Sequence, residues 1–188
     1  MIFVSDNGGP PVNASNNGPL RGYKAQTWEG GVRVPYMMQW KGKLPAGQVY
    51  EQPVIQLDFA PTALAAAGVK SDAKFDGVNL LPHFLGEVKT PPHDALYWRF
   101  GPQMAIRQGN LKLVKATGID QPQLFDLAAD IGESKDLSAE KPAVFKELSD
   151  KWAAWDKELV EPRWGPQKGV AGGKKAAKAE KAKRKNKT

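Results

Sequence analysis

A long loop between two apolar segments constrains the fold of this chain more than any other feature. The loop, "DNGGPPVNASNNGPLRGYKAQTWEGG", is rich in Gly, Asn and Pro and shows no apolar period. Ile2 to Val4 precede it and predict a short, fully buried strand of a parallel sheet, and "VRVPYMMQWKG" follows with strand character. A loop of about 25 residues exceeds what a compact domain uses for connection, so we predict that it is either functional or disordered.

The next segment predicts a helix. "LDFAPTALAAAGV" has Asp58 as its N-cap, Pro61 in its first turn and Gly68 as its C-terminal stop. The order strand, loop, strand, helix is typical of an α/β layer architecture. A Pro-rich stretch over residues 82–92 then predicts a linker to a second unit.

The second unit predicts an antiparallel sheet covered by one helix. Strand patterns occur in "ALYWRF", "MAIRQ", "LKLVK" and "PQLFDLAAD", with Gly109-Asn110 as a hairpin turn. The following helical segment repeats large apolar residues at steps of three and four, which gives it one apolar face. The residues of that face are Phe145, Leu148, Trp152, Trp155 and Leu159. We expect this face to pack on one side of the sheet.

The net charge of +7 comes from the C-terminal tail. Residues 174–188 hold eight of the 27 Lys and Arg residues and only Glu180 among the acids, which leaves 19 basic and 19 acidic groups in residues 1–173. We therefore predict a disordered, solubilising Gly/Ala/Lys-rich tail over 165–188 that can contact polyanions without specificity, and we do not expect nucleic acid as the main partner.

Other bulk features exclude several classes of protein. The chain of 188 residues contains no cysteine, so it has no disulfide, thiolate metal site or cysteine nucleophile. No apolar run reaches the roughly 18 residues of a membrane span, so we expect none. The first residues show no signal-peptide pattern, and the sequence by itself leaves the compartment undecided.

Asp6 and Asn7 form the first candidate site. They directly follow the predicted strand, and open α/β sheets bind ligands at the carboxyl ends of their strands. A carboxylate and an amide oxygen suit calcium, although two side chains do not complete its shell of 6–8 oxygens. The alternative is a plain turn, because Asp-Asn-Gly-Gly is common turn chemistry, and spacing alone favours the turn.

Lys24 is the second candidate. A lysine on a Gly-rich loop near a metal site can neutralise a sulfate or phosphate ester, although a solvated lysine is the default interpretation. Glu29 and Arg33 are four residues apart and predict an ion pair that stabilises the loop; a base role for Glu29 has no local support. His83 and His93 lie in Pro-rich connectors without partners at metal-ligand spacing, so we expect surface or packing roles.

The ordered set of motifs resembles the sulfatase family, within the alkaline-phosphatase superfamily. The motifs are "FVSDNGG", "GPLRGYKAQTWEGGVRVPYMMQWKGKLPAG", "QLDFAPTALAAAGV", "FDGVNLLPHFLG" and "LFDLAADIGESKDLS". They occur in the family's order over residues 2–160, and the match is to the C-terminal portion of the family. The resemblance is specific because five separate motifs share one order.

The resemblance implies a fold in three parts. Residues 1–88 would be the C-terminal part of the sulfatase mixed-sheet α/β domain, truncated relative to the family. Residues 93–164 would be the C-terminal subdomain, a small antiparallel sheet packed on a helix. Residues 165–188 would be the disordered basic tail. The overall fold class is therefore α/β.

The resemblance also implies roles for the candidate residues. Asp6 and Asn7 would be two ligands of an active-site calcium, and Lys24 would bind the substrate sulfate. With this family context, calcium ligation becomes the better interpretation of Asp6 and Asn7. The implied substrate is a sulfate ester such as a sulfated carbohydrate, and family habit implies a periplasmic or extracellular location.

The sequence departs from the family at the nucleophile. Sulfatases use a formylglycine made from the Cys or Ser of a C/S-x-P-x-R motif, and no serine of this chain has Pro two residues on and Arg four on. We expect that motif, and the remaining calcium ligands, on an N-terminal part that this chain lacks. The predicted function is a sulfuric ester hydrolase of the arylsulfatase type, inactive as this chain alone. The alternatives are a phosphate or phosphonate ester hydrolase of the same superfamily and a non-catalytic module that binds polyanions through its tail.

Overall fold

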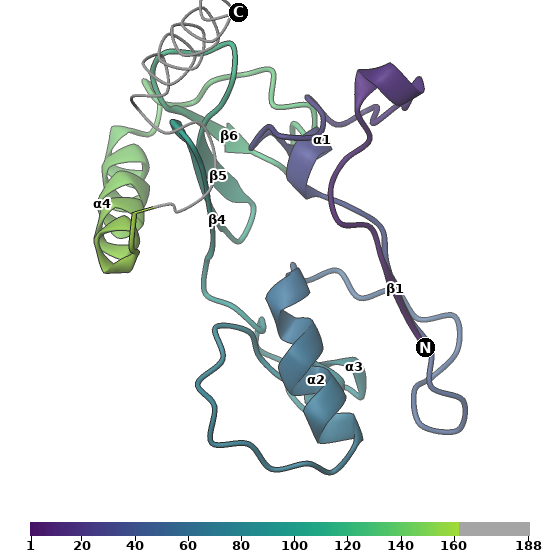
Figure 1. Cartoon of the computed structure of the whole chain (residues 1–188). Coiled ribbons are helices and arrows are strands. Elements are labelled where there is room, and N and C mark those ends of the chain that lie inside the picture. The colour runs from purple at the N-terminus through teal and green to yellow at the C-terminus, as the bar shows by residue number, and fades with distance from the viewer. Residues whose placement is uncertain (162–188) are drawn as a thin grey trace, which may run out of the picture.

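The computed structural model describes residues 1–161 of the chain (Figure 1). Two short strands and small helices form the first half, and a four-stranded sheet with a long helix forms the second half. The helices are α1 (Glu29–Val32), α2 (Phe59–Ala66), α3 (Leu81–Phe84) and α4 (Pro142–Glu158), with 3-10 turns at Pro11–Asn13 and Gln56–Asp58. The strands are β1 (Ile2–Val4), β2 (Tyr36–Met38), β3 (Leu96–Phe100), β4 (Gln103–Gln108), β5 (Leu111–Lys115) and β6 (Gln123–Asp126).

The prediction of a buried, parallel first strand was wrong. β1 pairs only with β2 among the described residues, antiparallel, with Phe3 opposite Met37. These two side chains are 53% and 58% exposed, so one face of the ribbon is open to solvent. An apolar run of three residues indicates a strand, but it does not indicate whether the strand pairs parallel or antiparallel, or how deeply it is buried.

The predicted helix after Asp58 is present as α2, which ends at Ala66, and Gly68 follows in the left-handed conformation at φ +66°. Asp58 holds the N-cap position, yet its side chain does not bond to the helix that follows. Its Oδ2 instead accepts a hydrogen bond from the Ile55 N–H at 2.9 Å, and Oδ1 accepts one from the Val78 N–H at 2.8 Å. His93 Nε2 lies 2.8 Å from the same carboxylate, so this buried group connects three segments.

The predicted antiparallel sheet and its helix are confirmed. The strands have the order β3-β4-β5-β6, all antiparallel, and Gly109-Asn110 connects β4 to β5. α4 lies against one face of the sheet (Figure 1). Alternate strand residues pack with Leu148 of α4 into one core, as the period of two predicts. These strand residues are Met104, Ile106, Leu113 and Leu124.

The opposite face of the sheet is covered by the long loop of the first half. Trp28, which is 2% exposed, packs there with the intervening strand residues. Its ring meets Phe125 edge-on with centroids 5.8 Å apart, and its Nε1 donates a hydrogen bond to the Thr117 carbonyl at 3.3 Å. The loop is therefore part of the core on this side, and α1 lies beside the sheet in Figure 1.

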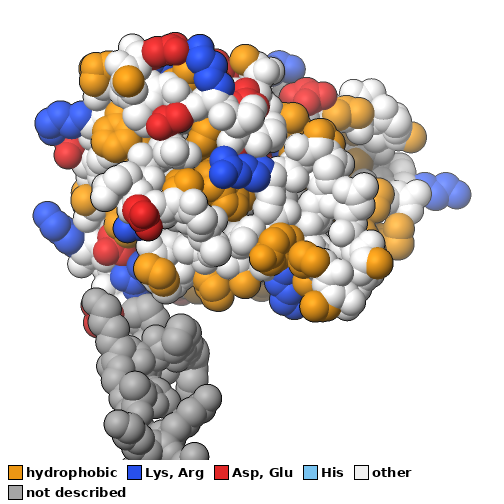
Figure 2. Space-filling model, turned by 90° about the horizontal axis from the view of Figure 1, so that it is seen from above, with side chains coloured by type: hydrophobic (Ala, Val, Ile, Leu, Met, Phe, Trp, Pro, Cys, Tyr) orange, Lys and Arg blue, Asp and Glu red, His pale blue; other side chains and the backbone are white. Residues whose placement is uncertain are grey.

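The remaining sequence predictions concern a membrane span, the basic tail and the division into two units. No helix among residues 1–161 is long and apolar enough to cross a membrane. The predicted tail over 165–188 lies outside the described residues, and the division at 88 and 93 stays a prediction. The face shown in Figure 2 carries Lys and Arg side chains interspersed with Asp, Glu and apolar groups, without one continuous basic patch.

Candidate active-site cleft

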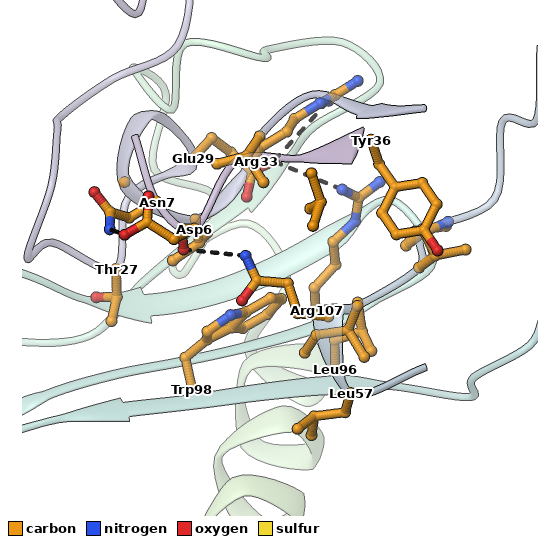
Figure 3. A pocket seen from close by; sticks show the side chains of 18 of the residues that line it. Asp6, Asn7, Thr27, Glu29, Arg33, Tyr36, Leu57, Leu96, Trp98 and Arg107 are labelled. Atoms are coloured by element: carbon orange, nitrogen blue, oxygen red, sulfur yellow. Dashed lines mark hydrogen bonds and ion pairs between the residues drawn. The ribbon is translucent and has the colours of Figure 1, made fainter. Parts of the chain in front are cut away.

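A cleft of about 830 Å³ lies between the long loop, the segment 49–57 and strands β3 and β4. All three site residues predicted from the sequence, Asp6, Asn7 and Lys24, line it. Figure 3 shows Asp6 and Asn7 together with arginine and aromatic side chains of the cleft. Its polar lining includes Asp6, Asn7, Lys24, Arg33 and Arg107. The fold therefore places the Asp6-Asn7 turn and Lys24 in one cleft, although most of the long loop separates them in sequence.

Backbone contacts hold the Asp6-Asn7 turn in place. Ser5 N–H donates to the Pro35 carbonyl at 3.2 Å, and Gly8 N–H donates to the Gly31 carbonyl at 3.0 Å. A Cβ on Gly8 would lie 1.7 Å from the Gly30 carbonyl oxygen, so only glycine permits this approach. The turn is therefore fixed against the start of α1.

The side chains of the turn offer two oxygen donors to a cation. Asp6 is exposed, and its Oδ2 accepts a hydrogen bond from Asn7 Nδ2 at 2.5 Å. Turning the Asn7 amide by 180° would place its oxygen beside the carboxylate, as a shared cation requires. The pair fits part of a calcium shell, and residues 1–161 contain no group of three or more His, Cys, Asp or Glu side chains able to hold a metal.

Lys24 is an exposed side chain, and the residues that directly follow it are held by the sheet. The buried Gln103 of β4 donates from Nε2 to the Ala25 carbonyl at 2.9 Å. Its Oε1 accepts hydrogen bonds from the N–H groups of Thr27 at 3.4 Å and Thr117 at 3.1 Å. One glutamine of the sheet therefore positions the segment that carries Lys24.

A buried ionic cluster lies beneath the cleft. Lys112 of β5 is fully buried, and its Nζ lies 2.8 Å from Glu29 Oε1 and 2.9 Å from Glu133 Oε1. Glu133 Oε2 also accepts a hydrogen bond from the Glu29 N–H at 2.7 Å, which satisfies a free donor at the start of α1. Burial raises the pKa of Glu133, while Lys112 opposes that shift.

Two arginines approach the other oxygen of Glu29 from the cleft side. Glu29 Oε2 is buried without a hydrogen bond, and it lies 3.6 Å from Arg107 Nη1 and 3.9 Å from Arg33 Nη1. The predicted pair of Glu29 with Arg33 is present, but it is the longest of the three contacts. Burial lowers the pKa of Arg107 from its usual value, Glu29 opposes that shift and Arg33 adds to it. Glu29 is thus a structural anion, enclosed by cations.

Sequence reasoning missed most of this cluster. Lys112 stands at an alternating position of "LKLVK" that resembles a solvated strand face, and Glu133 follows in a polar loop. Neither residue has a local sequence signal, because the face of β5 that holds Lys112 is covered by Trp28, which comes from a distant segment. The expected packing role of the histidines agrees with His93, whose Nε2 contacts Asp58.

Comparisons with known proteins agree with this geometry. The sulfatase family profile matches residues 1–69. Steryl-sulfatase of Mus musculus is 30% identical over 191 residues, covering 80% of this chain and 31% of that protein. The uncharacterized sulfatase YdeN of Escherichia coli (strain K12) is 44% identical over 105 residues, covering 52% of this chain and 18% of that protein.

Solved structures give the same result. The crystal structure of Ps i-CgsB in complex with k-i-k-neocarrahexaose has a TM-score of 0.79 and 32% identity, and the match covers 90% of this chain and 39% of that chain. The PsFucS1 sulfatase from Pseudoalteromonas sp. has a TM-score of 0.71 and 26% identity, covering 83% of this chain and 36% of that chain.

These matches place the chain in the alkaline phosphatase-like superfamily. Within that superfamily it belongs to the sulfatase family, and it corresponds to a C-terminal portion of its homologues. The chain spans less than a third of the length of the two curated relatives described above.

Proposed function

We propose that this chain carries part of the active site of a sulfuric ester hydrolase of the arylsulfatase type. In this proposal Lys24 binds the sulfate group of the substrate, and Asp6 and Asn7 are two of the calcium ligands. The observation that carries the proposal is that these three residues, from two separate turns of one long loop, line the same cleft. Membership of the sulfatase family supports the reaction class.

The chemistry of the three side chains suits this reaction. The ammonium group of Lys24 is exposed to the cleft and can neutralise one sulfate oxygen. The exposed carboxylate of Asp6 can bind a hard cation together with the Asn7 amide oxygen. Bound calcium would offset the negative charge of the sulfuryl oxygens.

The nucleophile is the part of the reaction that this chain does not supply. Its sequence contains no cysteine and no serine in a C/S-x-P-x-R motif, from which a formylglycine could form. We therefore propose that the chain alone does not turn over sulfate esters. Hydrolysis of an aryl sulfate by the pure chain, lost in Lys24→Ala, would contradict this part of the proposal.

Binding measurements test the site without requiring turnover. We expect the amide and side-chain NMR signals of Asp6 and Asn7 to shift on calcium titration, and Asp6→Ala to abolish those shifts. Inorganic sulfate should then shift signals around Lys24, with at least a several-fold loss of affinity in Lys24→Ala. Lys43→Ala is the matched control, because Lys43 is exposed and lies outside the cleft.

The same titration separates the proposal from its alternatives. Preference for inorganic phosphate over sulfate at Lys24 would favour a phosphate or phosphonate ester substrate. Binding of either anion with no dependence on Lys24 would favour a polyanion-binding module that uses residues outside the cleft. Sulfated carbohydrates are the proposed substrate class, because a relative was solved with k-i-k-neocarrahexaose and another with D-glucosamine-2-N, 6-O-disulfate.

A further inference from the structure

The charges around Glu29 do not balance. Three cationic side chains, Lys112, Arg107 and Arg33, lie within 3.9 Å of its carboxylate. Within residues 1–161, one further carboxylate, that of Glu133, contacts this group, through Lys112. The cluster therefore has one positive charge in excess, and the group most open to the cleft is Arg33, whose side chain is 48% exposed.

The two arginines also keep most of their hydrogen-bond donors free within residues 1–161. The Arg107 side chain donates only from Nε, to the Gly109 carbonyl at 3.0 Å, and the Arg33 side chain donates no hydrogen bond within these residues. Their distances of 3.6 and 3.9 Å to Glu29 Oε2 exceed hydrogen-bond length. In Figure 3 the dashed lines from both guanidinium groups converge on Glu29.

A third arginine of the cleft, Arg99, has hydrogen-bond acceptors for its guanidinium group. Arg99 donates to Asp156 Oδ1 at 2.8 Å and to the Val160 carbonyl at 2.7 Å. Within residues 1–161 the Nη atoms of Arg33 and Arg107 donate no hydrogen bond of this length, although both residues line the same cleft as Lys24. Guanidinium groups of this kind bind sulfate or carboxylate groups through paired N–H donors.

We infer that Arg33 and Arg107 form a second anion subsite, separate from Lys24, which binds a further sulfate or carboxylate group of the substrate. This inference rests on the proposed function for the identity of the first group. It names the substrate class more closely: a sulfate ester that carries a second negative charge. Glu29 fixes the two guanidinium groups from below without consuming their donors. Two carboxylates that also line the cleft, Asp6 and Glu51, oppose the subsite, and calcium would offset the first.

The test compares two ligands on the full chain in the presence of calcium. Glucosamine 6-sulfate and glucosamine 2-N,6-O-disulfate are titrated, and the indole N–H signal of Trp98, which lines the cleft, reports binding. We expect the disulfate to bind about tenfold more tightly, the gain typical of one charge-assisted interaction. In Arg33→Gln this preference should fall below about threefold, and in Arg33→Lys an intermediate value should remain.

The variants separate this inference from the proposed function. Lys24→Ala should weaken both ligands equally; if it leaves both unchanged while Arg33→Gln still removes the preference, the subsite stands and the role of Lys24 fails. An unchanged preference in a folded Arg33→Gln protein would overturn the subsite. Lys43→Gln removes one exposed positive charge outside the cleft and should change neither affinity.

Discussion

Lys112 on β5 donates a hydrogen bond of 2.8 Å to Glu29 at the start of α1, 83 positions earlier in the chain. Both side chains are buried, and Lys112 also contacts Glu133 at 2.9 Å. Through this one cation, the loop that carries the candidate site is tied to the C-terminal sheet. The geometry of the cleft therefore depends on a residue far from it in sequence.

Replacing Lys112 tests this connection. Lys112→Met would leave Glu29 and Glu133 buried without their shared cation, so we expect a loss of about 3–5 kcal/mol in the free energy of unfolding. Urea unfolding followed by tryptophan fluorescence measures it. Lys135→Met is the control, because its pair with Glu140 is exposed and contributes at most about 1 kcal/mol. Equal stabilities of the two variants would contradict the proposed connection.

Asp58 provides a second prediction. Asp58→Ala would remove the acceptor of the Ile55 and Val78 N–H groups and the contact of His93. We expect a loss of about 1–3 kcal/mol for each N–H group left without a partner. Thermal unfolding measures the effect, and the exposed Asp72→Ala should stay within about 0.5 kcal/mol of the unmodified chain. An Asp58→Ala protein as stable as the unmodified chain would contradict this role of the carboxylate.

The core beneath α4 provides a third prediction. Leu148 is 2% exposed and packs against Ile106 and Leu113. Leu148→Ala should cost about 2–5 kcal/mol, because the packed sheet cannot collapse into the space. Leu159→Ala, at a site 37% exposed, should cost clearly less. Denaturant midpoints of the two variants compare them directly, and a smaller loss at Leu148 would contradict the packing described.

Asp130 provides a prediction on pH. Its carboxylate accepts hydrogen bonds from the Lys135 N–H at 2.8 Å and from the Ser134 N–H at 2.7 Å and hydroxyl at 2.8 Å. These bonds, the Lys135 N–H first, lower the pKa of Asp130 below its usual 3.8. The stabilisation is therefore complete above the usual pKa and is lost as the pH falls through the lowered one.

We expect the stability difference between the unmodified chain and Asp130→Asn to be constant near pH 6 and to shrink as the pH falls below about 4. Urea unfolding over pH 3 to 6 measures it, and NMR titration of the Asp130 carboxyl carbon gives the pKa directly. Asp120→Asn, at an exposed position, provides the comparison. A difference that grows on acidification would reverse the sign and contradict the assignment.

Local patterns predicted the parts of the fold whose partners are near in sequence. The Gly109-Asn110 turn fixed which strands pair, because a two-residue connection leaves β4 and β5 no other register. The steps of three and four in α4 indicated its buried face, and Leu148 and Trp152 do pack on the sheet. The prediction was wrong for Leu159, which lies beyond the end of α4 and is 37% exposed. The order of motifs identified the sulfatase family, since it does not depend on any contact.

Other features depend on residues brought together from distant segments. The antiparallel pairing of β1, the contact of Trp28 with Phe125 and the cluster around Lys112 have no local signature. A lysine in a strand reads as solvent-facing until another segment covers it, and the pairing direction of three apolar residues is set by the strand beside them. Residue types and the order of the motifs therefore indicated the family and the candidate residues. Which charges are buried was decided by the tertiary structure, because burial and strand pairing depend on contacts between segments that are far apart in the sequence.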